Sequence, residues 1–357
     1  MAPVIAPQTD AQAIPLVFRD DSTDATKIID GKATATLLEQ QLKEELADHP
    51  VFKDTPPTLQ VMWVGQDTAS KIYVGNKVRG GKEAGVDVHL YPTRTEDRKD
   101  YTQPVPGSIT EVESVISQYN HSPAIDGIIV QSPLPVPGVS KDDMEGLFED
   151  VDPIKDVDGF TDHNLNLLKE KRAGLISCTP LGAMYLINGV IASGAELPNN
   201  SKAVVFGRSK HTGQPIATML EHQGFDVTMF GSKTHTEDEK RELSAQADVV
   251  VSAVGSPKPG QTPHRITTDY VKKGAIVIDI GMRQGPDGKT QGDVDLESVM
   301  GKAGYVNPTP RGTGPMTVMA LLVNTVIAAH HRRARETVLP ATAQQVWAVA
   351  KQREMGF

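Results

Sequence analysis

The sequence contains a single cysteine, Cys178, among its 357 residues. No intrachain disulfide can therefore form, and no metal site built from several thiolates is possible. Long hydrophobic runs are also missing, because the longest apolar segments, such as GAIVIDIG and AVVF, have the length of a strand rather than of a membrane-spanning helix. These absences fit a reducing compartment, and we expect neither a membrane span nor a bound metal.

A surplus of positive charge is missing as well. The chain has 36 Lys and Arg against 45 Asp and Glu, which gives a net charge of −9. Proteins that bind nucleic acid normally carry a basic surplus, so we expect no such partner. The first 26 residues include one arginine, Arg19, among several acids. Mitochondrial presequences are Arg-rich and acid-poor, so we expect a cytoplasmic protein, with mitochondrial import as the alternative.

What the sequence does contain is an alternation of short β-branched runs with helical patterns, which predicts parallel sheets with crossover helices. In the first half, strands are expected at 58–65, 87–93 and 126–135, with helices at 68–84 and 108–119 between them. In the second half the same alternation starts again at about residue 175. The expected elements there are strands at 201–209, 226–230, 248–255 and 275–281, a helix at 213–224 and a long apolar helix from Gly314.

This pattern predicts two α/β domains flanking a cleft. The first is expected at 26–174, with a C-terminal helix, 315–338, packing back on it. The second, 175–314, is expected to be a Rossmann-like NAD(P)-binding domain with a parallel sheet. Residues 1–25 and 339–357 are interpreted as extensions, the first flexible or docked on the surface and the second containing a short amphipathic helix.

The segment VVFGRSKHTGQP, 204–215, follows a predicted strand and opens a predicted helix. In that context Gly207 allows a tight turn, Gly213 allows close approach of helix and sheet, and the free N–H groups of the helix can hold a pyrophosphate. The spacing is G-x-S-x-x-x-G rather than G-x-G-x-x-G, and an ordinary βα turn is the alternative. The candidate cofactor-binding residues are Gly207, Arg208, Ser209, Gly213, Ser232, Val254 and Gly255.

The end of the next strand indicates which dinucleotide binds. NAD sites usually place an acid there, but neither Phe230 nor the two residues after it are acidic. A carboxylate would repel a 2′-phosphate, whereas Arg208, Ser232 and Lys233 would attract one. NADP is therefore predicted over NAD, unless Arg208 and Lys233 are merely solvated surface charges.

A second candidate site lies in the predicted helix KIYVGNKVRGGKE, 71–83, where Tyr73 and Lys77 are one turn apart. Gly80 and Gly81 follow, and each costs about 1 kcal/mol relative to Ala in a helix interior. That cost makes sense if something must approach the helix backbone closely. A Tyr–Lys pair at this spacing is common, however, and alone it indicates no function.

Six ordered segments strengthen the interpretation: YVGNK (73–77), DGIIVQSPLP (126–135), PIKDVDGF (153–160), SCTPLG (177–182), VVFGRSKHTGQP (204–215) and GPMTV (314–318). Together they resemble the methylenetetrahydrofolate dehydrogenase/methenyltetrahydrofolate cyclohydrolase family over roughly residues 27 to 330. The resemblance implies a bifunctional, homodimeric enzyme of folate one-carbon metabolism. Its substrate would be 5,10-methylenetetrahydrofolate, which is oxidised with NADP to the 5,10-methenyl cation and then hydrolysed to 10-formyltetrahydrofolate.

The resemblance also implies residue roles. Lys77 matches the family's catalytic lysine, Gln131 its orienting partner, and Tyr73 the tyrosine that packs on the folate and helps position Lys77. To act as a base near neutral pH, a lysine must be partly neutral against a free pKa of about 10.4, which burial and a cationic substrate favour.

Asp158 matches the pterin-binding aspartate, because a carboxylate suits two N–H donors side by side. Gly314 and Pro315 are likewise implied in substrate binding.

Other residues receive plainer interpretations. Gln131 could instead simply satisfy a strand end, and Asp156 is expected to cap its own loop. Cys178 is expected to be a small buried apolar residue rather than a nucleophile. The remaining expectations are His211 at the surface, Asp293 as a helix cap near the cofactor, and His330 to Arg333 as a solvated helix end.

The match also has departures. Relatives usually read PVPGGVGPMT where this chain reads PTPRGTGPMT, so Arg311 replaces a glycine and Thr313 a valine. Ser132 stands where leucine is usual. Arg311 could crowd the junction of nicotinamide and folate, or point outward.

Three alternatives therefore remain open: a monofunctional dehydrogenase without a working Lys77, a catalytically silent NADP-binding protein whose folate cleft Arg311 blocks, and an unrelated hydroxy-acid dehydrogenase. The absence of an obvious His–Asp pair in the cleft loops weighs against the last.

Overall fold

The computed structural model describes residues 15–23, 25–65, 68–93, 105–255, 262–285 and 288–350. The chain divides into two compact units. Of the described residues, unit 1 contains those up to Leu37, Thr179–Thr317 and 345–350, whereas unit 2 contains Leu38–Cys178 and Val318–Gln344. Both units are α/β with parallel sheets, as predicted. Helices α1, α10 and α11 have residues in both units.

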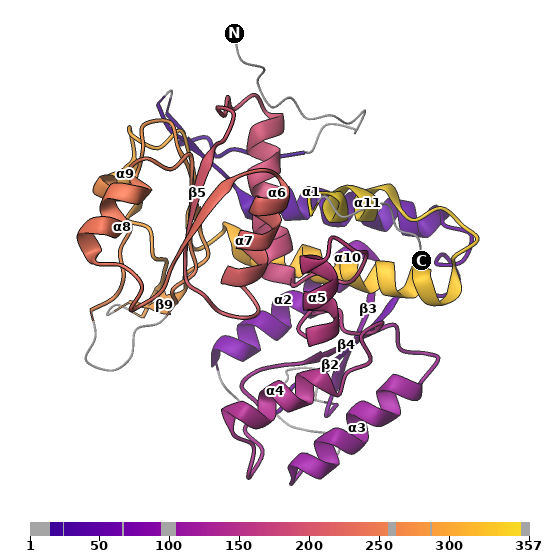
Figure 1. Cartoon of the computed structure of the whole chain (residues 1–357). Helices are drawn as coiled ribbons and strands as arrows, with labels where there is room; N and C mark the ends of the chain where they lie inside the picture. The colour runs from indigo at the N-terminus through magenta and orange to yellow at the C-terminus, as the bar shows by residue number, and fades with distance from the viewer. Residues whose placement is uncertain are drawn as a thin grey trace. The chain divides into compact units, whose positions relative to one another are not determined.

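The described strands of unit 2 form a parallel sheet in the order β3-β2-β4 (Figure 1). Their bounds are Thr58–Met62 for β2, Asp87–Tyr91 for β3 and Gly127–Val130 for β4. All four residues of β4 are buried, as expected for a strand of a parallel sheet that is covered on both faces. The strand predicted at 126–135 ends earlier than expected, because the prolines that follow Gln131 cannot donate to a ladder.

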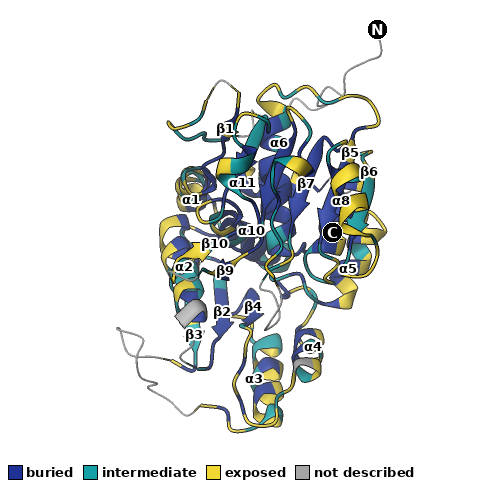
Figure 2. Ribbon diagram, turned by 90° about the vertical axis from the view of Figure 1, so that its left-hand side faces the viewer, coloured by how far each residue is buried: buried dark blue, intermediate teal, exposed yellow. Residues whose placement is uncertain are grey.

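Helices surround this sheet. Those of unit 2 are α1 (Gly31–Asp48, from Leu38 onward), α2 (Thr68–Ala84), α3 (Ile109–His121), α4 (Lys141–Glu149), α5 (Asp162–Lys169) and α10 (Thr313–Arg333, from Val318 onward). In Figure 2 the strands β2 and β4 are buried, while α3 shows alternating exposed and buried residues. Val112 and Ile116 form the buried stripe of α3 and belong to a core cluster with Met62 and Ile128.

Gly80 and Gly81 of α2 explain how tightly its neighbours pack. A Cβ added to Gly80 would lie 3.0 Å from the Val318 side chain of α10. One added to Gly81 would lie 2.3 Å from the Val88 side chain of β3 and 2.8 Å from the Val86 carbonyl oxygen. The close approach predicted at these glycines is therefore made by protein elements, and it brings α2 against both α10 and β3.

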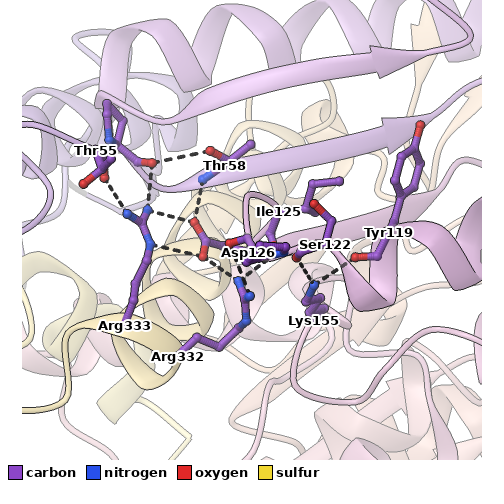
Figure 3. Close-up of polar contacts among 11 residues, drawn as sticks. Thr55, Thr58, Tyr119, Ser122, Ile125, Asp126, Lys155, Arg332 and Arg333 are labelled. Atoms are coloured by element: carbon purple, nitrogen blue, oxygen red, sulfur yellow. Dashed lines mark hydrogen bonds and ion pairs between the residues drawn. The ribbon is translucent and has the colours of Figure 1, made fainter.

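The end of α10 carries an ion-pair network rather than solvated charges, so the prediction for residues 330–333 was wrong. Arg332 and Arg333 both bind the buried Asp126 carboxylate, at 2.8 and 2.9 Å (Figure 3). The Asp126 carboxylate also accepts a hydrogen bond from the Thr58 N–H, at 3.0 Å. Nearby, the buried Lys155 ammonium donates to the Tyr119 and Ser122 carbonyl oxygens (Figure 3). The two arginine contacts with Asp126 fasten α10 to the sheet of unit 2.

The described strands of unit 1 form a parallel sheet in the order β1-β11-β8-β7-β5-β6. The strands are β1 (Lys27–Ile28), β5 (Lys202–Phe206), β6 (Asp226–Phe230), β7 (Val249–Ser252), β8 (Ile276–Asp279) and β11 (Tyr305–Asn307). A small antiparallel pair, β9 (Arg283–Gln284) with β10 (Thr290–Gln291), lies outside this sheet. From β5 the chain moves to β6 on one side and then to β7 on the other, which makes the carboxyl ends of β5 and β7 a topological switch point.

Helices cover both faces of the unit 1 sheet. Figure 1 shows α6 and α7 on one side of β5, and α8 and α9 on the other. The bounds are Cys178–Ala192 for α6, Gly213–His222 for α7, Glu237–Ser244 for α8, Thr268–Tyr270 for the 3₁₀ helix η1, Leu296–Val299 for α9 and Ala341–Ala348 for α11. One core cluster joins Phe206, Phe230, Val250, Tyr270 and Val277, so the sheet and its covering helices share a hydrophobic interior.

The N-terminal segment docks on unit 1 in the part that the structure describes. Phe18 forms an antiparallel bridge with Ile29, and the Tyr185 hydroxyl donates to the Pro15 carbonyl oxygen at 3.3 Å. A Cβ added to Gly189 of α6 would contact the Leu16 side chain at 3.3 Å. Of the two behaviours expected of this extension, the described residues show surface docking.

Within the described residues, α10 is the one helix long and apolar enough to cross a membrane by length and composition. The sequence analysis had found only strand-sized apolar runs. However, 78% of the apolar window of α10 is buried inside the protein, which is typical of a core helix. The absence of a membrane span stays a prediction.

Candidate active site

Unit 2 brings Lys77 and Gln131 together. Lys77 lies on α2, and Gln131 is the first residue after β4. The Lys77 Nζ donates to the Gln131 Oε1 at 2.8 Å across 54 residues of sequence. Both side chains are half-buried. The residue that follows β4 thus presents an amide oxygen to an amine on α2.

The Gln131 side chain is itself oriented. Its Nε2 donates to the Ser132 carbonyl oxygen at 2.9 Å, which leaves Oε1 directed at Lys77. Tyr73 lies one turn before Lys77 and is half-buried, and burial raises the pKa of its phenol. The phenol therefore stays protonated at neutral pH and can serve as a hydrogen-bond donor or a packing surface.

The loop that carries Asp158 is built around Asp156. The buried Asp156 carboxylate accepts hydrogen bonds from the N–H groups of Gly159, Phe160 and Thr161 at 2.9 to 3.1 Å. Its expected role as a loop cap is confirmed. Gly159 has a φ of +71°, and a Cβ there would lie 2.4 Å from the Ser177 nitrogen, so only glycine fits this turn. The loop is therefore rigid and pressed against residues 176–178.

Asp158 and Lys77 are close enough for their charges to interact. Burial raises the pKa of the Asp158 carboxyl, the positive charge of Lys77 opposes that rise, and the charge of Asp156 adds to it. The Cys178 thiol is within hydrogen-bonding reach of the Asp158 carboxylate. Burial thus disfavours the ionised form of this carboxyl, and a ligand with paired N–H donors would favour the ionised form.

Cys178 is buried, as predicted, with 2% of its surface exposed. Its thiol donates to the Val157 carbonyl oxygen at 3.1 Å. Burial and the nearby Asp158 carboxylate raise the pKa of this thiol well above its usual value. A thiolate nucleophile is therefore disfavoured at this position.

In unit 1 the phosphate-binding turn lies at the switch point. Gly207 follows β5 with a φ of +109°, and a Cβ there would lie 2.4 Å from the Ala253 carbonyl oxygen. A Cβ on Gly213 would lie 2.1 Å from the Gly207 carbonyl oxygen. The turn closes on itself through the Gly213 N–H, which donates to the Ser209 Oγ at 3.2 Å. Both glycines are required by close backbone approach, and α7 begins directly at this turn.

The residues expected at a 2′-phosphate are exposed next to this turn. Arg208, Ser232 and Lys233 are all exposed, and no acidic side chain occurs between the end of β6 and the start of α8. A Cβ on Gly231 would lie 2.9 Å from the Arg208 Cδ, so the aliphatic part of Arg208 lies along the residue that follows β6. The arrangement suits an anion at the end of β6.

Val254 and Gly255 follow β7, and Val254 is 46% exposed. The Val254 N–H donates to the buried Asp293 carboxylate at 3.0 Å, and the Ser252 hydroxyl donates to it at 2.9 Å. The prediction that Asp293 caps a helix was wrong, because Asp295 is the residue that caps α9. Asp293 instead accepts hydrogen bonds from Ser252 and Val254 and so fixes the start of the loop after β7.

Gly314 and Pro315 open α10 within unit 1, and Gly314 is exposed with open space beside it. Arg311, just before them, has a φ of +80° and directs its guanidinium to the Asp30 carboxylate at 2.7 Å. Thr313 is buried, and its hydroxyl donates to the Asp279 carbonyl oxygen at 3.1 Å. Arg311 and Thr313, which depart from the usual loop sequence, therefore both make polar contacts within unit 1.

Asn324 was not among the predicted site residues, yet it is fully buried on α10 and donates to the carbonyl oxygens of Val157, next to Asp158, and of Ile176. A signal for it existed, because Asn324 interrupts the apolar run ALLVNTVIAA.

Among the described residues no group of three or more His, Cys, Asp and Glu side chains could hold a metal ion.

The two sites define a class of protein. A parallel sheet with a glycine turn at its switch point is the architecture of a dinucleotide-binding unit, and the second α/β unit carries a lysine held by an amide. Known proteins agree with this class. Residues 29–158 match the tetrahydrofolate dehydrogenase/cyclohydrolase catalytic domain, and residues 177–333 match the NAD(P)-binding domain of the same family. The chain belongs to the tetrahydrofolate dehydrogenase/cyclohydrolase family.

Individual relatives cover nearly the whole of this chain. Bifunctional protein FolD of Campylobacter curvus is 36% identical over 312 residues, which are 86% of this chain and 96% of that protein. The crystal structure of bifunctional FolD from Campylobacter jejuni is 32% identical and covers 86% of this chain and 100% of its own, with a TM-score of 0.71. That of the Trypanosoma brucei dehydrogenase-cyclohydrolase, complexed with NADP cofactor and an inhibitor, is 28% identical and covers 85% of this chain and 97% of its own, with a TM-score of 0.71.

Proposed function

We propose that this chain oxidises 5,10-methylenetetrahydrofolate with NADP and hydrolyses the resulting 5,10-methenyl cation to 10-formyltetrahydrofolate. The observation that carries this proposal is the 2.8 Å hydrogen bond between Lys77 Nζ and Gln131 Oε1, at positions that match the motifs of the family. Membership of a family that combines a dehydrogenase/cyclohydrolase catalytic domain with an NAD(P)-binding domain supports both activities.

For the hydrolysis, Lys77 handles the proton. Water adds to the methenyl carbon, one of its protons leaves to a base, and the ring opens to give the formyl group. Gln131 orients the Lys77 amine through its oxygen, and the Ser132 carbonyl holds that amide in turn. Asp158 binds the pterin through its paired N–H donors, and this contact offsets the burial of the carboxylate. Tyr73 packs beside the substrate on the face of α2 that carries Lys77.

NADP, when bound, supplies the acceptor for the hydride. The residues present fit this cofactor, because the tight Gly207 to Gly213 turn lies at the switch point and leads directly into α7, whose N-terminal dipole favours a pyrophosphate. Arg208 and Ser232 would bind the 2′-phosphate at the end of β6, where no carboxylate opposes it. Val254 and Gly255 would lie along the cofactor at the end of β7.

The retained Lys77–Gln131 contact favours the bifunctional enzyme over a monofunctional dehydrogenase, which would need no working lysine for hydrolysis. The contact of Arg311 with Asp30 accounts for that arginine without a block of the folate site. A homodimer, which the family resemblance implies, is part of the proposal and is tested by light scattering of the purified protein.

The test follows the two steps separately by absorbance. Purified protein is given methylenetetrahydrofolate with NADP or with NAD, and the methenyl species is recorded as it forms and decays. We expect formation with NADP to exceed formation with NAD, followed by decay faster than in buffer alone. No methenyl formation with either cofactor would refute the dehydrogenase activity. Formation followed by decay at the rate in buffer would refute the cyclohydrolase activity.

A further inference from the structure

Asn324 of α10 is a buried polar residue with an unusual set of contacts. It is 0% exposed, and its amide Nδ2 donates to the Val157 carbonyl oxygen at 2.9 Å and to the Ile176 carbonyl oxygen at 2.7 Å. One side-chain amide therefore connects two segments that are separated by 18 residues of sequence. These two segments carry Asp158 and Cys178.

The orientation of the amide follows from its partners. An NH₂ group has two protons, and each meets one carbonyl oxygen, whereas the reversed amide would place its oxygen against both carbonyl oxygens. The Asn324 Oδ1 is left on the other side, buried and without a hydrogen-bond partner in the described part of the chain. A buried acceptor without a partner is unfavourable, and an apolar side chain of the same size would fill the space without that cost. The specific contribution of Asn324 at this position is therefore its two donated hydrogen bonds.

The same two segments are joined by further bonds around Asp158. The Ser177 hydroxyl donates to the Gly159 carbonyl oxygen at 2.8 Å, and the Cys178 thiol donates to the Val157 carbonyl oxygen. The backbone on both sides of Asp158 is thus held, by Val157 and by Gly159, while the carboxylate stays available. Asn324 is the member of this set that comes from a different element, a long buried helix.

We propose that Asn324 is a positioning residue, which holds the loop at Val157 so that the Asp158 carboxylate has the geometry needed to bind the substrate. The inference rests on the proposed function, because it assigns Asp158 to folate binding. Asn324 itself touches no substrate. Helix α10 fixes one end of the Asp158 loop. A small displacement of that loop would strongly weaken the contact in which the Asp158 carboxylate accepts two hydrogen bonds from the substrate.

The test replaces Asn324 with Leu, which has a similar size and no donors. We expect the KM for methylenetetrahydrofolate to rise at least tenfold, while kcat changes less than threefold and the Kd for NADP changes less than twofold. The matched control is Thr325→Val. Thr325 is equally buried on the next position of α10, but its hydroxyl donates within the helix to the Leu321 carbonyl oxygen. We expect its KM to stay within twofold of the unmodified protein.

A double-mutant cycle with Asp158→Asn separates positioning from general loss of structure. If Asn324 acts through Asp158, Asn324→Leu raises KM less than twofold in the Asp158→Asn background. An equal rise in both backgrounds, or a rise for Thr325→Val that matches Asn324→Leu, would overturn the inference and leave the proposed function standing. An unmodified chain that binds no folate would overturn both.

If Asn324→Leu fails to fold, Asn324→Asp tests the same inference, because it replaces the two amide donors with an ionisable carboxyl group. A carboxylate at this position repels the two carbonyl oxygens when ionised and can donate one hydrogen bond when protonated. We therefore expect its KM defect to grow as pH rises from 6 to 8.5, and a defect that does not change with pH would contradict the inference.

Discussion

Asp158 places a half-buried carboxyl group on a loop that the protein holds rigidly. Burial raises its pKa, and the nearby charge of Lys77 only partly opposes that rise. Such a group destabilises the folded state at pH values where it must ionise, so its retention indicates binding rather than stability. The same conclusion cannot be drawn for Asp156, whose carboxylate is used entirely by its own loop.

Replacement of Asp158 with Asn should therefore stabilise the protein while it weakens substrate binding. A carboxyl whose pKa is higher in the folded than in the unfolded state contributes stability at low pH and loses it as pH rises through the folded pKa. We expect the melting temperature of Asp158→Asn to exceed that of the unmodified protein at pH 8, with a smaller difference at pH 5. Calorimetry at the two pH values measures this, and a variant that is less stable at pH 8 would contradict it.

Arg208 allows a prediction about cofactor choice. Its side chain is exposed beside Gly231, at the end of β6. Hydrogen bonds to charged groups contribute about 1.5–3 kcal/mol each, so Arg208→Ala should weaken NADP binding by roughly 10- to 100-fold. NAD lacks the 2′-phosphate, and its affinity should change less than about twofold. Titration of both cofactors by calorimetry tests this, and an equal loss for NAD and NADP would show that Arg208 does not read the 2′-phosphate.

At the scale of elements, the position of Lys77 depends on how α2 packs. Gly80 and Gly81 allow α10 and β3 to approach this helix closely. A Cβ at Gly81 would lie 2.3 Å from the Val88 side chain and 2.8 Å from the Val86 carbonyl oxygen. We expect Gly81→Ala to destabilise the protein by about 1–3 kcal/mol, because overpacking outweighs the helix propensity of alanine. Urea denaturation monitored by circular dichroism measures the change.

Gly146 provides the matched control for that substitution. It lies within α4, and a Cβ there would meet nothing within 4 Å. Gly146→Ala should therefore stabilise the protein by up to about 1 kcal/mol through helix propensity alone. Stabilisation by both substitutions would mean that the contact between α2 and β3 is looser than described here.

Element prediction from sequence succeeded where one pattern dominated. Helix α2 was expected at 68–84 and is Thr68–Ala84, and β6 was expected at 226–230 and is Asp226–Phe230. Helix α6 was not predicted, because CTPLGAMYLINGVIA is apolar on all sides and shows no helical period. Helix α1 was also missed, although the buried Leu38, Leu42 and Leu46 recur every four residues and provide a usable signal.

Site prediction succeeded where a short motif carried the residue and was incomplete where partners are distant in sequence. The contact between Lys77 and Gln131 joins two predicted residues across 54 positions. The partners of Asp126 could not be predicted in the same way. Arg332 and Arg333 are more than 200 residues away, and a basic helix end is usually solvated, so only the packing of α10 reveals their role.

At the scale of the whole molecule, stability depends on a few long-range polar contacts. Asp126 is buried and binds two arginines from the end of α10. Removal of one partner of a buried pair costs about 3–5 kcal/mol, which is a large part of the total stability of a typical protein. We expect Asp126→Ala to lower the free energy of unfolding by about 3 kcal/mol or more, measured by denaturant unfolding.

An exposed ion pair provides the comparison. Arg172 and Glu170 form a salt bridge of 2.9 Å with side chains that are 67% and 57% exposed. Surface pairs contribute about 0–1 kcal/mol, so Arg172→Ala should change the unfolding free energy by less than about 0.5 kcal/mol. If the two substitutions have equal effects, the network at the end of α10 does not stabilise the fold as proposed.

If the amine of Lys77 handles the proton during hydrolysis, its removal must abolish that step. Purified Lys77→Met is given 5,10-methenyltetrahydrofolate, and its decay is followed by absorbance beside the unmodified protein, with the Kd for NADP measured in parallel. We expect enzyme-dependent hydrolysis to fall by at least about 100-fold, while NADP binding stays within twofold. Unchanged hydrolysis in the Lys77→Met protein would contradict it.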